Sequence, residues 1–484
     1  MAREVPPPRP PRKFLIDGRL RPLKPGEVRP YVPPELEPEP EAEATEVKVV
    51  EVVEEDVQVL ARPWYGAPMV GNLVLGARLP IRGTFQARSS RYCTGRKWWA
   101  LLPFGWICAR QARPTAGPPT DTPVLQVAPG ERLPFRYVMV SSQEPIPMWA
   151  NIEDFKEGRD PERMLEKGDS VAIDKLWKFD GESFYLSVEG RVLPTRGTYT
   201  LGQGSSWQGV LLDEKTHFPM GWVLPEHGKL LDAPGGKPVG VLPRRTRVDI
   251  LEEVQQGGKR FLRVQPSDAA AANAAPAATA GPAALWMSAA EVNEVRRRQM
   301  PAGVNPVGRW IDVDVGEQTL VAYEGDRPIF ATLISSGRAV PTPLGNYPVW
   351  AKVTSITMKS QPYDDKAYFV NKVPWVLFFQ AHNAIHGAYW HDRFGVSKSH
   401  GCINVSPLDA RYLFEWLPPA LPHGWVAVRP VDLRESVTVH IYNSHLRRPF
   451  RQERPIGPPD REDEAERLEA AERRRAEQAA ASAP

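Results

Sequence analysis

Long apolar runs, cysteine and concentrated charge of one sign are all scarce in this 484-residue sequence. No apolar run approaches the roughly 20 residues that a transmembrane helix needs, so no membrane-spanning helix is expected. Lysine and arginine total 61 against 58 aspartate and glutamate, a net charge of +3, and no basic face stands out. The composition therefore argues against a nucleic-acid-binding protein, and no nucleic-acid partner is expected.

An export signal is also missing from the first residues. The stretch from Met1 to Lys13 is rich in proline and arginine and lacks the apolar segment of a secretory signal peptide. The numbered chain therefore shows no signal peptide.

Only three cysteines are present. Cys93 and Cys108 lie close together in the N-terminal half, whereas Cys402 stands alone in the C-terminal half. A near pair plus a lone cysteine is typical of one structural disulfide and one reactive thiol. Three unpaired thiols are the alternative. A bond between Cys93 and Cys108 would be worth on the order of 3 kcal/mol and would indicate an oxidising compartment.

Length and proline content indicate several domains joined by extended chain. A chain of 484 residues exceeds what one hydrophobic core can organise, and 52 prolines are a high number. Residues 1–59 are rich in proline and then in glutamate and valine, so we interpret them as a disordered tether. Residues 447–484 are interpreted as a charged, solvent-exposed tail.

Between these ends, short apolar runs alternate with glycine and proline turns at intervals of about ten residues, which is typical of small β-barrels. Three related β-units are predicted, at residues 60–115, 125–225 and 226–300. An Ala/Pro tract at 268–284 interrupts the third unit and is interpreted as a loop insertion.

The β-units resemble bacterial SH3-like (SH3b) domains, whose strands end in a Gly-Trp-Val type of signature. Such a run occurs at residues 221–223. The resemblance implies binding to cell-wall peptides or glycans. The simpler explanation of Trp98, Trp106 and Trp222 is that they form barrel core.

Residues 305–446 carry a clearer series of strands. The stretch 310–315 alternates apolar and polar residues with period two, and runs at 319–323 and 328–333 flank a turn signal. The pattern predicts three consecutive antiparallel strands.

One helix is expected in this half, beginning after Ser406. Serine is a favourable N-cap, Pro407 suits the first helical position, and the carboxylate of Asp409 favours the helix start. The predicted fold class is therefore mainly β, with small SH3-like barrels followed by a β-rich domain that has few helices, between disordered termini.

Histidines gather around the lone cysteine. Seven of the nine histidines lie between His382 and His445. A cysteine attacks a carbonyl as its thiolate, so it needs a neighbour that takes its proton, and histidine has a pKa near neutrality. Gly401 leaves the backbone before Cys402 unencumbered, so amide N–H groups can approach a developing oxyanion. These residues predict a nucleophilic cysteine.

The same residues resemble a known family. His386-Gly387, followed by Ser-His-Gly-Cys-Ile-Asn at 399–404, is similar to the signature of YkuD-type L,D-transpeptidases. Thr-Pro-Leu-Gly at 342–345 resembles the Thr-Pro-x-Gly segment of that family, and the resemblance extends from Gly308 to Leu446. It implies a mostly β domain whose active-site cysteine lies on a loop between a strand and a helix.

The resemblance implies a role for each matching position. Cys402 is the nucleophile, and His386 is the general base, with a backbone carbonyl near Gly387 orienting its imidazole. The amides of His400, Gly401 and Cys402 form the oxyanion hole, and the His400 side chain supports the loop. Residues in contact with the substrate are Tyr389, Trp390, Ser399 and Asn404.

The implied reaction is a two-step acyl transfer between peptidoglycan stem peptides. Cys402 attacks the carbonyl of residue three of a tetrapeptide donor and expels D-alanine, and the amine of a diamino acid on a neighbouring stem then forms a 3–3 cross-link. Water as acceptor gives an L,D-carboxypeptidase, and a lysine of an envelope protein gives an attachment enzyme. The resemblance also implies acylation by carbapenem-type β-lactams, no cofactor, and a location in the cell envelope or periplasm of a bacterium.

Two alternatives belong to other classes. His382, His386, His400 and Cys402 are a plausible zinc ligand set by residue type, but the run 382–386 has no glutamate to act as a base, so no metal is expected. A wall-binding protein with a silent catalytic domain is the second alternative.

Overall fold

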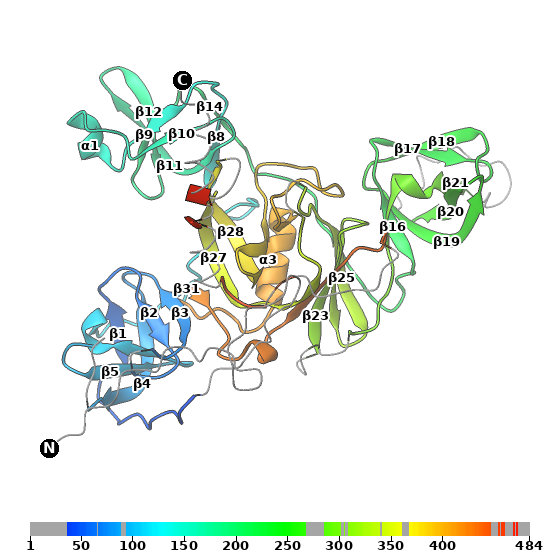
Figure 1. Cartoon of the computed structure of the whole chain (residues 1–484). Helices are drawn as coiled ribbons and strands as arrows, with labels where there is room; N and C mark the ends of the chain where they lie inside the picture. The colour runs from blue at the N-terminus through cyan, green and yellow to red at the C-terminus, as the bar shows by residue number, and fades with distance from the viewer. Residues whose placement is uncertain are drawn as a thin grey trace.

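The computed structural model describes residues 36–446 except 65, 89–92, 268–284, 302–303, 305–307, 339–340 and 361–366, together with 454, 456–459, 468–469 and 471–472. The start of the expected tether, the Ala/Pro tract and most of the expected tail therefore lie outside the described residues. Four β-rich units are present, with the unit that begins at residue 308 in the centre and three smaller units around it (Figure 1). This arrangement confirms the mainly β fold class.

The first unit is a set of short antiparallel strands. Its strands are β1 (Val49–Val52), β2 (Gln58–Leu60), β3 (Met69–Leu73), β4 (Arg78–Gln86), β5 (Lys97–Leu101), β6 (Trp106–Cys108) and β7 (Ala112–Pro114). Strand β1 pairs with both β4 and β7, so the ordered unit begins before residue 60. The predicted boundary was wrong because the Glu- and Val-rich composition hid an alternating strand, in which Val50 and Val52 are buried.

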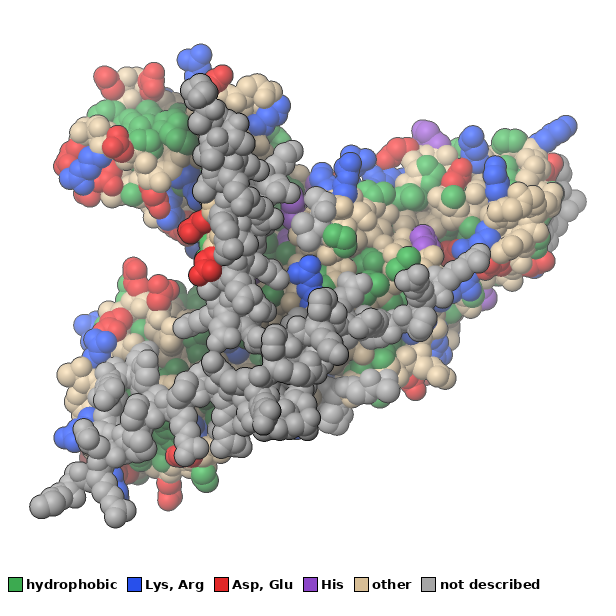
Figure 2. Space-filling view, in the orientation of Figure 1, with side chains coloured by type: hydrophobic (Ala, Val, Ile, Leu, Met, Phe, Trp, Pro, Cys, Tyr) green, Lys and Arg blue, Asp and Glu red, His purple; other side chains and the backbone are tan. Residues whose placement is uncertain are grey.

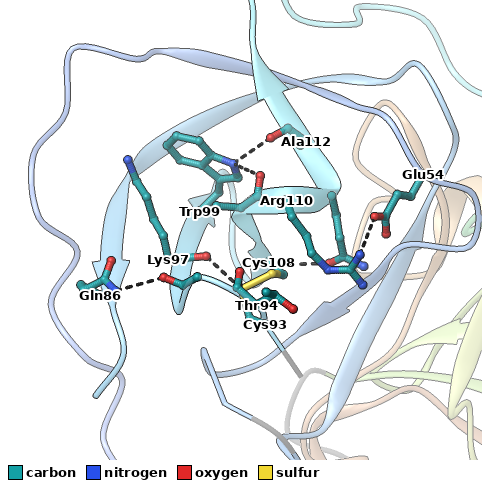
Figure 3. Close-up of a disulfide and its surroundings, with 12 residues drawn as sticks. Glu54, Gln86, Cys93, Thr94, Lys97, Trp99, Cys108, Arg110 and Ala112 are labelled. Carbon is teal, nitrogen blue, oxygen red and sulfur yellow. Dashed lines mark hydrogen bonds and ion pairs between the residues drawn. A yellow bond between two sulfur atoms is a disulfide. The ribbon is translucent and has the colours of Figure 1, made fainter. Parts of the chain in front are cut away.

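A disulfide joins Cys93 and Cys108 in the first unit, with an S–S distance of 2.03 Å (Figure 3). Close by, the indole N–H of Trp99 donates to the carbonyl oxygen of Ala112 at 3.1 Å. The two sulfurs share a buried cluster that includes Trp98 and Trp106. Both tryptophans are therefore core residues, which is the simpler of the two explanations.

The second unit includes one short helix. Its elements are β8 (Arg136–Val140), β9 (Ile146–Met148), α1 (Ile152–Lys156), β10 (Arg163–Leu165), β11 (Ser170–Phe179), β12 (Glu182–Ser187), β13 (Val192–Pro194) and β14 (Thr198–Thr200). Hydrophobic side chains gather on the face of this unit that Figure 2 shows. Exposed apolar residues of the unit include Met164, Leu176 and Phe179.

The third unit is a seven-stranded sheet. Its strands are β16 (Met220–Val223), β17 (His227–Leu231), β18 (Pro238–Pro243), β19 (Arg247–Gln256), β20 (Lys259–Pro266), β21 (Leu285–Ser288) and β22 (Val292–Val295). Strand β16, which carries Trp222, pairs with β19 and β22 and so belongs to the third unit, whereas the predicted boundary placed it in the second. The Trp222 side chain is buried.

The central domain packs one helix with two sheets. The first sheet has the order β15 (Val210–Leu211), β25 (Arg327–Leu333), β24 (Thr319–Glu324), β23 (Arg309–Asp314), β32 (Thr438–Tyr442) and β26 (Gly345–Pro348). The second contains β27 (Ala351–Lys359), β28 (Phe369–Gln380), β29 (Asn383–Gly387), β30 (Ile403–Val405) and β31 (Trp425–Val428). Strands β23, β24 and β25 confirm the three predicted antiparallel strands.

Helix α3 (Pro407–Trp416) shares a buried core with both sheets, to which Ile311, Ile385 and Leu413 contribute. The Ser406 hydroxyl accepts the backbone N–H of Asp409, so the predicted helix start is confirmed. Within the described residues, no helix combines the length and apolar character needed to cross a membrane.

The first unit and the central domain share backbone hydrogen bonds. Strand β3 pairs with β31, so that Gly71 lies opposite Val428. The Trp425 ring packs into the apolar core of the first unit. A Cβ atom at Gly71 would lie 2.3 Å from that ring, so only glycine fits there. A β-sheet therefore continues from the first unit into the central domain through the pairing of β3 with β31.

Candidate active site

Strand pairing places the cysteine and the histidine on one face of the second sheet. Strands β29 and β30 are parallel, with Ile385 opposite Ile403 and His386 opposite Asn404. Because side chains alternate along a strand, the two isoleucines face the buried core and His386 and Asn404 face the other way. Cys402 directly precedes β30 and lies two positions from Asn404, so it shares the face of His386.

This placement refines the loop predicted for the cysteine. Cys402 ends the long loop that follows β29, and the three-residue strand β30 separates it from helix α3. The positive end of the helix is therefore not directly beside the sulfur in the chain.

The Cys402 thiol lies in apolar surroundings. The residue is half-buried, and Sγ is 3.8 Å from the carbonyl oxygen of His382, within reach of a weak S–H hydrogen bond. Although part of the residue stays exposed, burial raises the pKa of the thiol to about 11, and a backbone N–H from Ala384 offsets only part of this rise. At neutral pH the sulfur is therefore protonated in the free protein.

The His386 imidazole is buried and neutral. Burial lowers its pKa to about 4. Its Nδ1 lies 3.4 Å from the carbonyl oxygen of Gly387, the contact that the family resemblance implied. A carbonyl oxygen can only accept, so Nδ1 carries the hydrogen and Nε2 is left as the basic nitrogen. The Trp390 ring lies 5.7 Å from the imidazole, between centroids.

The two groups are thus a neutral pair: a protonated thiol and an unprotonated imidazole. A base with a depressed pKa does not hold a proton at rest, and a thiol with a raised pKa does not release one. This resting state fits a reaction in which proton transfer accompanies bond formation between sulfur and carbon. The arrangement can support acyl transfer, in which His386 takes the proton as Cys402 attacks.

The residues before Cys402 form a tight loop that Ser399 and Thr342 hold. The Ser399 hydroxyl donates to the carbonyl of Cys402 and accepts the N–H of Gly401 at 3.3 Å. The Thr342 hydroxyl donates to the carbonyl of Gly401 at 2.9 Å. Gly401 has φ +123°, a conformation that favours glycine. Ser399 is buried, so it organises the loop, which differs from the substrate contact implied for it.

His400 differs from its expected role. Its side chain is exposed and stacks on Tyr368, with 5.3 Å between ring centroids. It therefore faces outward and does not support the loop from within. The N–H of Gly401 is engaged by Ser399, which leaves the amides of His400 and Cys402 as the candidate oxyanion donors.

Tyr389 was assigned to the substrate cleft by resemblance, and the structure contradicts this. The ring is buried and stacks on Tyr137 of the second unit at 3.6 Å between centroids. Its hydroxyl donates to the carbonyl of Asn371 at 2.7 Å and lies 2.9 Å from the hydroxyl of Ser170. Tyr389 therefore joins the central domain to the second unit. Trp390, its neighbour, is only partly buried and packs near His386.

Asn404 is buried beside His391, a histidine for which the sequence predicts no function. Nε2 of His391 lies 3.0 Å from the Asn404 amide, and its Nδ1 accepts the N–H of Arg393 at 3.2 Å. Burial, reinforced by nearby Lys398, lowers the His391 pKa to about 3, so the ring is neutral and its one hydrogen is on Nε2.

A hydrogen on Nε2 of His391 requires an acceptor opposite it. We therefore assign the Asn404 amide with its oxygen toward Nε2 of His391. The NH₂ group then takes the other position of the amide, which is buried and has no hydrogen-bond partner among the described residues. A second histidine five positions after the general base was the only sequence signal for this pair.

Metal ligands do not converge here. Within the described part of the chain, no three His, Cys, Asp or Glu side chains gather as a metal site. His400, one member of the zinc set considered from the sequence, stacks outward on Tyr368.

Comparison with known proteins identifies the domain that carries this site. Residues 308–437 match the family described as YkuD, L,D-transpeptidase catalytic domain. A search of curated protein sequences found no match.

Several solved structures of L,D-transpeptidases are similar to part of this chain. A crystal structure from Enterococcus faecium, a cysteine-to-serine mutant, is 24% identical, covering 28% of this chain and 50% of that one, with a TM-score of 0.23. A structure from Mycobacterium smegmatis is 17% identical, covering 40% and 99%, with a TM-score of 0.23. The catalytic domain from E. faecium acylated by ertapenem is 25% identical, covering 28% and 97%, with a TM-score of 0.23. With TM-scores this low, the assignment of residues 308–437 rests on the family match alone.

Proposed function

Because residues 308–437 are a YkuD-type L,D-transpeptidase catalytic domain, we propose that this protein cross-links peptidoglycan by cysteine acyl transfer. The donor is a tetrapeptide stem, the acceptor is the side-chain amine of a diamino acid on a neighbouring stem, and the product is a 3–3 cross-link. One observation supports the proposal: in the parallel pair of β29 and β30, His386 lies opposite Asn404, which follows Cys402 by two positions.

In the first step the Cys402 sulfur attacks the carbonyl carbon of stem residue three. His386 Nε2 takes the thiol proton as the S–C bond forms. The C–N bond to the terminal D-alanine then breaks, and the imidazolium gives the proton to the departing amine. A thioester on Cys402 and free D-alanine result.

In the second step the acceptor amine attacks the thioester carbonyl. His386 takes a proton from the attacking nitrogen, the C–S bond breaks, and the sulfur recovers the proton. The carbonyl oxygen gains negative charge in both steps. The amides of His400 and Cys402 are the donors proposed to stabilise it.

The neutral resting pair suits an enzyme whose cysteine reacts only with a bound donor. A thiol with a pKa of about 11 is a poor nucleophile until substrate arrives. Reaction therefore depends on a bound donor whose carbonyl lies near both residues. Carbapenem-type β-lactams, which present a strained carbonyl, are expected to acylate Cys402 in the same way.

Alternative outcomes of the same chemistry depend on the acceptor. Water gives an L,D-carboxypeptidase, and a lysine of an envelope protein gives an attachment enzyme. A wall-binding protein with a silent catalytic domain is the alternative of another class. The buried neutral base, whose Nδ1 faces the carbonyl oxygen of Gly387, supports an active site over a silent one.

The Cys93–Cys108 disulfide supports a location in the cell envelope or periplasm. Disulfides persist in oxidising compartments and are rare in the cytosol. Peptidoglycan cross-linking takes place in the same compartment. The first and third units are proposed to bind wall peptides or glycans, as their resemblance to SH3b domains implies.

The test is to incubate the purified full chain with disaccharide-tetrapeptide and to identify products by mass spectrometry. A cross-linked dimer with released D-alanine is expected, and Cys402→Ala is expected to give neither product. Tripeptide without dimer would indicate a carboxypeptidase. No D-alanine release from a folded protein, together with binding to wall sacculi, would favour the binding protein.

A further inference from the structure

The segment that joins the general base to the nucleophile is held by other units of the chain. Residues 389–395 follow β29 and precede the loop of Cys402. Within this segment, Trp390 packs near His386 and His391 contacts Asn404. The position of the segment therefore sets the surroundings of both catalytic groups.

Arg245 of the third unit binds this segment through Asp392. Its guanidinium donates to the Asp392 carboxylate at 2.8 and 3.1 Å and to the Asp392 carbonyl oxygen at 2.7 Å. This forked contact fixes both the side chain and the backbone of Asp392. Burial alone would raise the Asp392 pKa, but hydrogen bonds from Arg245 and Ser205 outweigh it and lower the pKa.

Two more residues of the third unit bind the next positions. Arg244 donates to the carbonyl oxygen of Phe394 at 3.1 Å, and the Asn293 amide donates to that of Gly395 at 3.1 Å. Together with Arg245, they bind the backbone at three of the four positions from 392 to 395. Such repeated main-chain contacts fix the path of a segment, whereas a single surface ion pair contributes little.

The backbone conformation and the burial of Arg245 restrict its side chain to this contact. It lies in the turn between β18 and β19 with φ +67°, a conformation that residues other than glycine rarely adopt. Its side chain is only 16% exposed, and its guanidinium lies 5.1 Å from the centroid of the Trp207 ring. Trp207 in turn donates to the Thr332 hydroxyl of β25 at 2.9 Å. The guanidinium thus has a fixed place between two units.

We infer that Arg245 is a positioning residue of the active site: by holding Asp392, the third unit keeps Trp390 and His391 in place against His386 and Asn404. The inference deepens the proposed function and rests on it. The third unit then contributes to catalysis directly, in addition to any wall binding.

The opposing explanation is that Arg245 only attaches the third unit. The two explanations differ in what they predict for Cys402. If Arg245 positions the segment, its removal exposes His386 and the buried part of Cys402 to water, so catalysis slows while the thiol becomes easier to alkylate. If it only attaches the unit, stability falls and neither rate changes at temperatures where the protein is folded.

The experiment uses four variants of the full chain: Arg245→Ala, Arg245→Lys, Asp392→Asn and the double variant Arg245→Ala/Asp392→Asn. Arg263→Ala is the matched control, because Arg263 pairs with Glu252 at 2.9 Å within the third unit. For each protein, kcat and KM for D-alanine release, the rate of Cys402 alkylation by iodoacetamide at pH 8, and the melting temperature are measured.

Arg245→Ala is expected to lower kcat by about tenfold or more with KM within about twofold, because small misplacements of catalytic groups are costly. Alkylation is expected to be several-fold faster, Arg245→Lys to recover part of kcat, and the double variant to be no worse than the worse single variant. Arg263→Ala is expected to match the unsubstituted protein.

An unchanged kcat and alkylation rate in folded Arg245→Ala, or equal changes in Arg263→Ala, would overturn the inference. The alkylation measurement separates the two proposals. If the unsubstituted protein releases no D-alanine, the proposed function fails, and the effect of Arg245 on the reactivity of Cys402 still decides whether this residue controls the site.

Discussion

The hydroxyl of Thr342 forms a hydrogen bond with Gly401, the residue before the nucleophile, although 59 positions of sequence separate the two residues. It donates to the Gly401 carbonyl at 2.9 Å and accepts the N–H of Gly337 at the same distance. Thr342 of the Thr-Pro-x-Gly segment therefore has a structural role at the site. It fixes the carbonyl group of Gly401 and so the orientation of the peptide bond between Gly401 and Cys402.

Thr342→Val is expected to slow acylation of Cys402 by about tenfold, because valine keeps the shape and loses both hydrogen bonds. The measurement is the rate of covalent adduct formation with a carbapenem, followed by mass spectrometry. Thr342→Ser retains the hydroxyl and is expected to stay within about threefold of the unsubstituted protein. Equal rates in the valine and serine variants would contradict the role given to the hydroxyl.

Alkylation of Cys402 should reveal its raised pKa. A thiol with a pKa of about 11 reacts through a small thiolate fraction, so the iodoacetamide rate is expected to rise about tenfold per pH unit from pH 7 to pH 10. Cys93 and Cys108 are bonded to each other, so the signal comes from one sulfur. Cys402→Ser is the control and should not be labelled. A rate that levels off below pH 9 would show that the pKa of the thiol is not raised to about 11.

The buried histidines should make the protein sensitive to mild acid. His386 has a pKa of about 4 when folded and near 6.5 when unfolded, so below pH 6.5 the unfolded chain takes up a proton that the folded chain does not. Stability is therefore full above pH 6.5, falls as the pH drops toward 4, and levels off below that. Between pH 7 and pH 5 the loss from His386 is expected to be about 2 kcal/mol.

Urea unfolding of the central domain at the two pH values measures this loss. In His386→Gln part of the loss is expected to disappear, because glutamine does not titrate. His423→Gln changes an exposed histidine and is the control that should keep the full loss. The same loss in both variants would remove His386 as its source.

Removing the disulfide should weaken the first unit. The bond closes a loop of 15 residues, so Cys93→Ser/Cys108→Ser is expected to lower the free energy of unfolding by roughly 3 kcal/mol. Thermal unfolding followed by hydrogen exchange of the backbone amides in β5 and β6 reports on this unit, because Trp98 and Trp106 of these strands share a buried cluster with the bond. Reduction of the unsubstituted protein should give a similar loss, and the reactivity of Cys402 should be unchanged. An unaltered transition in both cases would count against a stabilising bond.

Local patterns were enough to predict much of the central domain. Alternation at 310–315 gave β23, and the capping residues Ser406 and Pro407 gave the start of α3, because both signals depend on neighbours in sequence. Strand β1 was missed because its residues also suit a charged tether, and only pairing with distant β4 and β7 orders them.

The surroundings of the site could not be read from the sequence because they depend on distant contacts. Arg245 and Asp392 are separated by 147 positions, and no local pattern links them. Tyr389 resembles a substrate residue beside Trp390, and only the stacking of Tyr137 shows that it is a contact between units. His391 looks like any core histidine until its partner Asn404 is known.

The pairing of β3 with β31 determines how the catalytic part can be isolated. A fragment cut to residues 308–446 would lose β3 from one sheet and β15 from the other, leaving the backbone N–H and C=O groups of β31 and β25 unpaired along one edge. The Trp425 ring and one face of Tyr389 would meet water as well. Exposed edges of this kind invite strand exchange between molecules, so the shortened fragment is expected to precipitate, and crystallisation or inhibitor screening should start from the longer chain.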